Sequence, residues 1–121
     1  MGYSGGAAVA VLLAARRHDV GSVRTLAGNL DLEAVNRHHR VGPLTGSMDP
    51  MDAAKSVSGI PQMHFIAEKD SVVPAAAIEN FLNASGNERC IQIRKVSEAT
   101  HHEGWTQKWP ELVRLPVFCS E

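Results

Sequence analysis

The sequence predicts an α/β fold, with a mostly parallel sheet of about three strands flanked by helices. Three observations support this prediction: a glycine-rich start runs into an Ala/Leu-rich segment, β-branched alternating segments recur, and helical patterns separate them. Strands that alternate with helices at this pace need crossover connections, which give parallel pairing. A chain of 121 residues is long enough for one modest core, so we treat residues 1–121 as a single domain.

The first half of the chain begins with an Ala/Leu-rich helix over residues 7–17. This helix ends in two arginines, which suit the negative end of a helix dipole. Its apolar residues lie nearly all round, so we expect it to be buried on more than one side. A strand, a short helix capped by Asp31 and a helix behind an Asp49-Pro50 cap are then predicted over residues 22–27, 31–35 and 51–57.

The second half contains the clearest strand, over residues 60–67, closed by a polar turn. The next helix has apolar positions at helical spacing and ends at Gly86. In the last helix Pro110 interrupts the pattern and is a candidate break point. This helix, strand and last helix are predicted over residues 74–84, 90–96 and 104–115.

The composition excludes several classes of protein. A formal net charge of −1 and a pI near 6.6 provide no basic surface for nucleic acid or anionic lipid. The longest apolar stretch, residues 7–15, is too short to cross a bilayer, so we expect no membrane partner and, by default, a cytoplasmic location. Cys90 and Cys119 form no C-x-x-C motif, which argues against a zinc ribbon or a thioredoxin-type site. Whether they pair is left open.

Residues 2–6 (Gly-Tyr-Ser-Gly-Gly) fit the G-x-S-x-G pattern of a nucleophile elbow. Such a serine, here Ser4, sits on a sharp strand-to-helix turn that exposes its hydroxyl. The flanking chain approaches closely there, so we expect side chains at Gly2 and Gly6 to clash. Gly5 N–H is the candidate oxyanion-hole donor, at the positive end of the following helix. A phosphate-binding loop is the alternative, although neither the P-loop lysine nor G-x-G-x-x-G is present.

The candidate acid is Asp70, because the order expected in this fold is serine, acid, histidine. Asp70 follows the clearest strand, and the carboxyl ends of parallel strands are where open α/β sheets collect functional groups. Its alternative interpretation is an ordinary turn aspartate. Asp49 and Asp52 compete for the role, but both lie at a predicted helix start, where capping explains them.

The candidate base is one of two adjacent histidines, His101 and His102, which follow the third strand. The residues alone leave the choice open, since only one imidazole can bridge the serine and the acid. The alternatives are a pair of loop histidines or a weak metal site, for which no further ligands stand at suitable spacing. The remaining histidines are predicted at surface or core positions: His18, His38, His39 and His64.

Six segments recur in an order that resembles the α/β-hydrolase family, in particular its bacterial members known only as hydrolases. They are residues 2–7 (GYSGGA), 27–31 (AGNLD), 46–50 (GSMDP), 60–65 (IPQMHF), 70–74 (DSVVP) and 101–105 (HHEGW). The resemblance covers nearly the whole chain. It implies Ser4 as nucleophile and Asp70 as its acid. In relatives with an H-x-x-G-W motif the histidine stands four positions before the tryptophan, which implies His101 rather than His102.

The resemblance also implies that an N-terminal half is missing. Family members have further strands there, together with a loop that gives the second oxyanion donor. No strand is expected in the three residues before Ser4, so we expect a partial α/β-hydrolase domain, residues 1–121, starting at the elbow. Loss of one oxyanion donor typically costs ~2.7–4 kcal/mol of transition-state stabilisation. The sheet edge left open is a site for self-association.

The function expected from these observations is a serine hydrolase that cleaves ester-like bonds in a small-molecule substrate. Ser4, Asp70 and His101 form its triad, and the chemistry needs no metal or cofactor. The alternative is a non-catalytic truncated α/β domain that acts through self-association or by binding a partner. A third hypothesis, a nucleotide-binding half-domain built on the glycine turn, is weaker because the phosphate-loop motifs are absent.

Overall fold

The computed structural model describes residues 1–40, 42 and 48–120. Its centre is a sheet of four strands in the order β1-β2-β3-β4, and every neighbouring pair is parallel. This confirms the predicted α/β fold class. The strands are β1 (Gly2–Tyr3), β2 (Val23–Leu26), β3 (Gln62–Ala67) and β4 (Ile91–Val96).

The strand before Ser4 corrects the sequence prediction, which expected about three strands and none in that position. β1 has two residues, and it pairs with β2 through Gly2 opposite Thr25 and Tyr3 opposite Leu26. The ladder continues past β1, because the Ser4 amide donates to the Leu26 carbonyl at 2.9 Å. Two residues therefore suffice to attach the start of the chain to the sheet edge.

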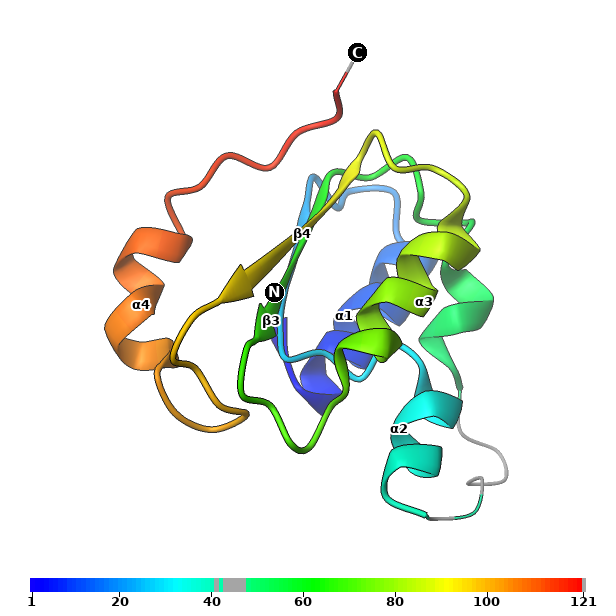
Figure 1. Ribbon diagram of the computed structural model, residues 1–121. Helices are drawn as coiled ribbons and strands as arrows, with labels where there is room; N and C mark the ends of the chain where they lie inside the picture. Colours follow the sequence, from blue (N-terminus) through cyan, green and yellow to red (C-terminus); the bar gives the residue numbers. More distant parts are fainter. Residues whose placement is uncertain (41, 43–47, 121) are drawn as a thin grey trace.

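Helices cover both faces of the sheet (Figure 1). α1 and α3 lie on one face, and α4 lies on the other, where it follows β4. α2 lies beside α3. The helices are α1 (Gly5–Arg16), α2 (Leu32–His38), α3 (Ala75–Ser85) and α4 (Trp105–Leu112), with a short 3₁₀ turn η1 (Pro50–Ala53) between α2 and β3.

β3 separates two apolar cores and contributes to both. Every residue of β3 is buried, as expected for an inner strand of a parallel sheet with helices on both faces. Ile66 belongs to the core under α1 and α3, and Phe65 to the core under α4. On the α4 side, Trp105 and Leu112 are the helix residues that bury this face. The carboxyl end of β3 is thus held from both sides.

Local signals account for most helix boundaries. The Asp31 carboxylate caps α2 by accepting from the Ala34 amide at 3.2 Å, and Gly86 ends α3 with a φ of 69°. The expected helix over 51–57 is instead the 3₁₀ turn η1. Pro110 lies inside α4 without breaking it.

One face of α1 corrects the expectation that this helix is buried on more than one side. Ala7, Val11 and Ala14 pack on the sheet, but Val9 and Leu13 are 56% and 52% exposed. α1 packs against β1, β2 and η1, and Val9 and Leu13 lie on the side that these elements leave exposed.

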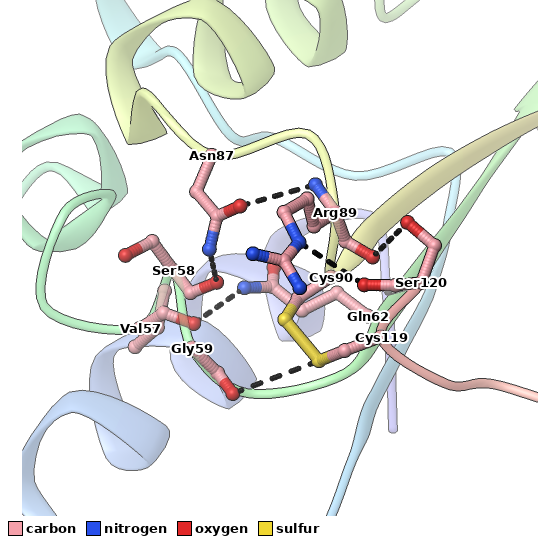
Figure 2. The surroundings of a disulfide bond; sticks show 9 residues. All are labelled: Val57, Ser58, Gly59, Gln62, Asn87, Arg89, Cys90, Cys119 and Ser120. Carbon is pink, nitrogen blue, oxygen red and sulfur yellow. Dashed lines mark hydrogen bonds between the residues drawn. A yellow bond between two sulfur atoms is a disulfide. The ribbon is translucent and has the colours of Figure 1, made fainter.

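A disulfide joins Cys90, just before β4, to Cys119 in the C-terminal segment (Figure 2). Beside it, the Ser120 amide donates to the Arg89 carbonyl at 2.7 Å, so the tail is also held by backbone. Disulfides persist mainly in oxidising compartments, whereas the sequence predicts a cytoplasmic location by default. The cellular location of the protein therefore stays a prediction. Within the described residues, no helix is both long and apolar enough to span a membrane.

Candidate active site

Ser4 occupies the sharp turn between β1 and α1. Its backbone has φ 53° and ψ −119°, a region that non-glycine residues rarely adopt. Three hydrogen bonds hold it: the Ser4 amide bonds to β2, and the Ser4 carbonyl accepts from the Ala7 and Asn29 amides, both at 3.1 Å. A conformation that costs about 1–3 kcal/mol is therefore maintained by its surroundings, as is common where a side chain must be presented.

The glycines that flank Ser4 are not equivalent. A Cβ on Gly2 would lie 2.3 Å from the Gly6 carbonyl oxygen and 2.6 Å from the Ala7 Cα, which no backbone tolerates. A Cβ on Gly6 meets nothing within 4 Å. The expected close approach is present, but the expected clash at Gly6 is wrong, because its Cβ direction leads away from β1.

Asp70 lies in the turn that follows β3, at the position predicted from the sequence. Its Oδ1 accepts two backbone hydrogen bonds, from the Val72 and Val73 amides, both at 2.8 Å. Its Oδ2 lies 3.0 Å from His101 Nδ1. The carboxylate side chain is only 3% exposed. Asp70 is thus more than a turn aspartate, since its second oxygen contacts a histidine 31 positions away.

His101 bridges the acid and the serine. Its Nε2 lies 2.9 Å from Ser4 Oγ, while its Nδ1 faces Asp70. Because a carboxylate only accepts, Nδ1 carries the proton and Nε2 is left as the acceptor for the Ser4 hydroxyl. The three sequence-predicted side chains therefore meet within hydrogen-bonding distance, although 97 positions separate Ser4 from His101.

His102 points elsewhere. Its imidazole is almost perpendicular to that of His101, with ring centroids 4.8 Å apart and an interplanar angle of 89°. Its Nδ1 lies 3.2 Å from the hydroxyl of Tyr3. The backbone of this pair is held by Trp105, whose indole N–H donates to the His101 carbonyl at 3.1 Å. Of these two histidines, His101 is the one that contacts both Ser4 and Asp70.

Tyr3 and the histidines at the end of α2 are site residues that the sequence analysis missed. Tyr3 Oη donates to the His101 carbonyl oxygen at 2.6 Å. His38 and His39, expected only as surface or core histidines, donate from Nε2 to the Ser71 and Val72 carbonyls at 3.0 and 2.6 Å. They hold the loop that carries Asp70. No local pattern could have revealed these contacts, because each spans 33 or more positions.

α1 begins directly after Ser4, which is its N-cap residue. Gly5 and Gly6 form the first turn of this helix, and first-turn amides have no intrahelical acceptor. No acidic residue lies in that turn to neutralise the positive end of the helix. Gly5 N–H, directly after Ser4, is thus available for a negative oxygen.

The other candidates have structural roles or lie apart from this group. Asp49 caps η1 by accepting from the Met51 amide at 3.1 Å, and Asp52 is an exposed residue of the same turn. His64 is fully buried in the sheet. Across the described ranges, no group of three or more His, Cys, Asp or Glu residues could hold a metal ion. Residues 46 and 47 of the 46–50 motif lie outside the described residues.

Comparison with known proteins supports the fold but not a family by sequence. No protein-family model matches the chain, and no curated protein matches it. Several solved structures do. An esterase domain from Rhodothermus marinus aligns with a TM-score of 0.64 at 18% identity, over 83% of this chain and 50% of its own.

Two further structures give the same result. An esterase from Pyrococcus furiosus has a TM-score of 0.69 at 15% identity, covering 93% of this chain and 48% of its own. An alpha-beta serine hydrolase homologue from Coxiella burnetii has a TM-score of 0.61 at 17% identity, covering 92% and 43%. The chain spans about half the length of these structures. Over that half, it has the fold of the α/β hydrolases.

Proposed function

We propose that this chain is a serine hydrolase domain that cleaves ester-like bonds, with Ser4 as nucleophile, His101 as base and Asp70 as acid. One observation carries the proposal: Ser4 Oγ, the His101 imidazole and the Asp70 carboxylate form a continuous relay with distances of 2.9 and 3.0 Å. A nucleophile hydrogen-bonded to a base that a third group orients is the arrangement of serine catalysis. The esterases among the structural neighbours support the same class.

The reaction follows from the direction of the protons. Ser4 Oγ attacks the substrate carbonyl carbon as its proton passes to His101 Nε2. The imidazolium, stabilised by Asp70, then gives that proton to the leaving oxygen, and the acyl group stays on Ser4. Water attacks the acyl carbon and loses a proton to Nε2. The bond between that carbon and Ser4 Oγ then breaks, Oγ takes the proton back from Nε2, and the carboxylic acid is released. Every proton is accounted for, so the cycle needs only water besides these side chains.

The negative oxygen of each tetrahedral intermediate needs donors. Gly5 N–H lies next to the nucleophile at the positive end of α1 and is the donor we assign. Removing one such donor typically costs ~2.7–4 kcal/mol of transition-state stabilisation. The hydrolysis rate of this chain therefore depends strongly on how many N–H groups bind the negative oxygen of the intermediate.

A fluorophosphonate probe tests the assignment directly, because it phosphonylates only a serine activated by a base. We expect the wild-type chain to be labelled at Ser4, and Ser4→Ala to remain unlabelled. Ser22→Ala is the matched control: this serine is exposed, and its loss should leave labelling unchanged. Equal labelling of wild type and Ser4→Ala, or no labelling of a folded wild-type chain, would overturn the proposal.

A second candidate function, self-association, has support from one surface. β1 is an edge strand, and above it α1 exposes Val9 and Leu13, the apolar pair on its outer side. Unpaired strand edges and exposed apolar patches mark association sites. The partner we assign is a second copy of this chain. Its net charge is only −1, so electrostatic repulsion between two copies is weak and does not oppose their association.

Sedimentation at several concentrations distinguishes this candidate. We expect a dimer that Leu13→Lys converts to a monomer, since a lysine at this position places a charge in the apolar contact. Val113→Lys is the control, as Val113 is an exposed apolar residue after α4. A monomeric wild-type chain at all concentrations would exclude the association.

A further inference from the structure

Tyr3 contacts both histidines from its position beside Ser4 on β1. Its hydroxyl oxygen lies 2.6 Å from the His101 carbonyl oxygen and 3.2 Å from His102 Nδ1. Its ring lies 5.5 Å from the His101 imidazole, centroid to centroid. The residue as a whole is 41% exposed, so packing in the core does not explain its position.

The protons of these contacts have only one consistent direction. A carbonyl oxygen only accepts, so the single Tyr3 proton is donated to His101. The contact with His102 must then run the other way, from Nδ1–H to the Tyr3 oxygen. The result is a chain of two hydrogen bonds from the His102 ring through Tyr3 to the His101 backbone.

These bonds connect the backbone of the base to the segment that carries the nucleophile. His101 lies in the turn between β4 and α4, where its carbonyl accepts from two side chains, Tyr3 Oη and Trp105 Nε1. Trp105 belongs to α4, so it locates His101 relative to that helix. Tyr3 immediately precedes Ser4, so it alone of the two locates His101 relative to the serine.

We propose that Tyr3 is a positioning residue, which sets the distance between His101 Nε2 and Ser4 Oγ by holding the His101 carbonyl. This inference rests on the proposed function of Ser4 and His101 but concerns a group that does not touch the reacting atoms. Misplacing a base by a fraction of an ångström lowers the rate of proton transfer without unfolding the chain.

The state of the phenol is consistent with a permanent donor. Partial burial, and then the negative charge of Asp70, raise the pKa of Tyr3 above its ordinary value of 10.0. The hydroxyl therefore keeps its proton at every pH where a histidine base is useful. The titratable groups that face it are Asp70, His101 and His102.

Tyr3→Phe removes the donor and keeps the ring. We expect the rate of fluorophosphonate labelling of Ser4 to fall about tenfold, as for the loss of one well-made hydrogen bond, while the unfolding midpoint changes little. The low-field proton resonance of His101 Nδ1–H should shift or exchange faster with solvent. Wild-type labelling together with an unchanged resonance would overturn the proposal.

The resonance keeps this test separate from the test of function. If the wild-type chain is not labelled at all, the proposed function fails, yet the Nδ1–H signal still reports whether Tyr3 holds His101. His102→Phe should have a smaller effect than Tyr3→Phe, because the Tyr3–His101 bond remains. An equal or larger effect of His102→Phe would contradict the proposal that the Tyr3 hydroxyl donates to the His101 carbonyl.

A second experiment avoids any risk of misfolding in Tyr3→Phe. Tyr3 is the only tyrosine of the chain, so growth on 3-fluorotyrosine alters this phenol alone and lowers its pKa. We expect labelling of Ser4 to decline at alkaline pH as Tyr3 ionises, with the midpoint moving to lower pH in the fluorinated protein. An alkaline profile that is identical in both proteins would overturn the proposal.

Discussion

The two oxygens of Asp70 have separate partners. Oδ1 accepts from two backbone amides and holds the loop, whereas Oδ2 faces His101 and orients its ring. A residue with this division of roles can lose one function and keep the other. An asparagine retains one oxygen for the backbone amides but presents an N–H₂ group to a histidine nitrogen that is itself a donor.

Asp70→Asn should therefore preserve the fold and disable the base. The imidazole would rotate or change tautomer to avoid two opposed donors, which removes its acceptor from Ser4. We expect labelling of Ser4 to slow by about 10⁴-fold, as in serine enzymes with the wrong tautomer. Asp52→Asn, a change at an exposed aspartate, is the control. A labelling rate within a few fold of wild type would contradict the role assigned to Asp70.

The glycines around Ser4 give a stability prediction with an internal control. Gly2→Ala places a methyl group 2.3 Å from the Gly6 carbonyl oxygen, and we expect a loss of about 3 kcal/mol or more in the free energy of unfolding. Gly6→Ala meets open space in the first turn of α1, so we expect no loss and a gain of up to about 1 kcal/mol. Denaturant titration measures both. A similar loss of unfolding free energy in the two variants would contradict the close approach of Gly2 to Gly6 in the turn around Ser4.

At the scale of elements, β2 and β3 are joined by a buried polar ladder. Thr25 Oγ1 lies 2.7 Å from His64 Nδ1, and His64 Nε2 lies 2.9 Å from Gln62 Oε1. The Gln62 amide group donates to the Val57 carbonyl, so its oxygen must accept from His64. His64 is thus a neutral core histidine with its proton on Nε2, and burial lowers its pKa to about 4.

This ladder makes stability depend on pH. Between the ordinary pKa of 6.5 and the folded value of about 4, the unfolded chain binds a proton at His64 that the folded chain does not. The free energy of unfolding should be largest above pH 6.5 and fall toward pH 4, by about 3 kcal/mol in total from this group.

Urea titrations across this pH range check the prediction. His64→Gln should remove most of the slope, whatever its effect on stability at neutral pH. His18→Gln should leave the slope intact, since His18 is exposed. A slope that survives in His64→Gln and disappears in His18→Gln would contradict the assignment.

At the scale of the whole molecule, the disulfide encloses the segment that carries His101. Cys90 and Cys119 are 29 positions apart, and between them lie β4, the His101 turn and α4. α4 contributes Trp105 and Leu112 to the core on its face of the sheet. Fastening the tail after α4 to the start of β4 therefore limits how far this helix can separate in partly unfolded states (Figure 2).

Removing the disulfide should destabilise the chain mainly through the unfolded state. A closed loop of this length corresponds to about 3–4 kcal/mol of lost chain entropy. We expect the Cys90→Ser/Cys119→Ser double variant to lose stability of this size in denaturant titration. The oxidised wild-type chain treated with a reductant should match it, and the double variant should not respond to reductant. Equal stability with and without the bond would contradict the prediction.

Much of the fold could be predicted from the sequence, because its signals act over a few residues. Alternating and helical patterns located three strands and the four α-helices to within a few positions, and G-x-S-x-G marked the turn at Ser4. Elements that lack local signals were missed or misjudged. β1 has two residues and exists only because β2 is there to pair with it, and the outer face of α1 is exposed because none of the described elements packs on it.

The sequence by itself determined the order of the elements and the chemical types available: a serine on a glycine turn, an aspartate after a buried strand and two histidines after the next. The residues alone left two histidines open and only the family resemblance implied His101, whereas only the tertiary structure decided that Cys90 pairs with Cys119 and that Tyr3 contacts His101. The physical reason is the separation along the sequence between the residues that interact. Backbone preferences are set by near neighbours, whereas a contact across 97 positions depends on how the strands and helices between them pack.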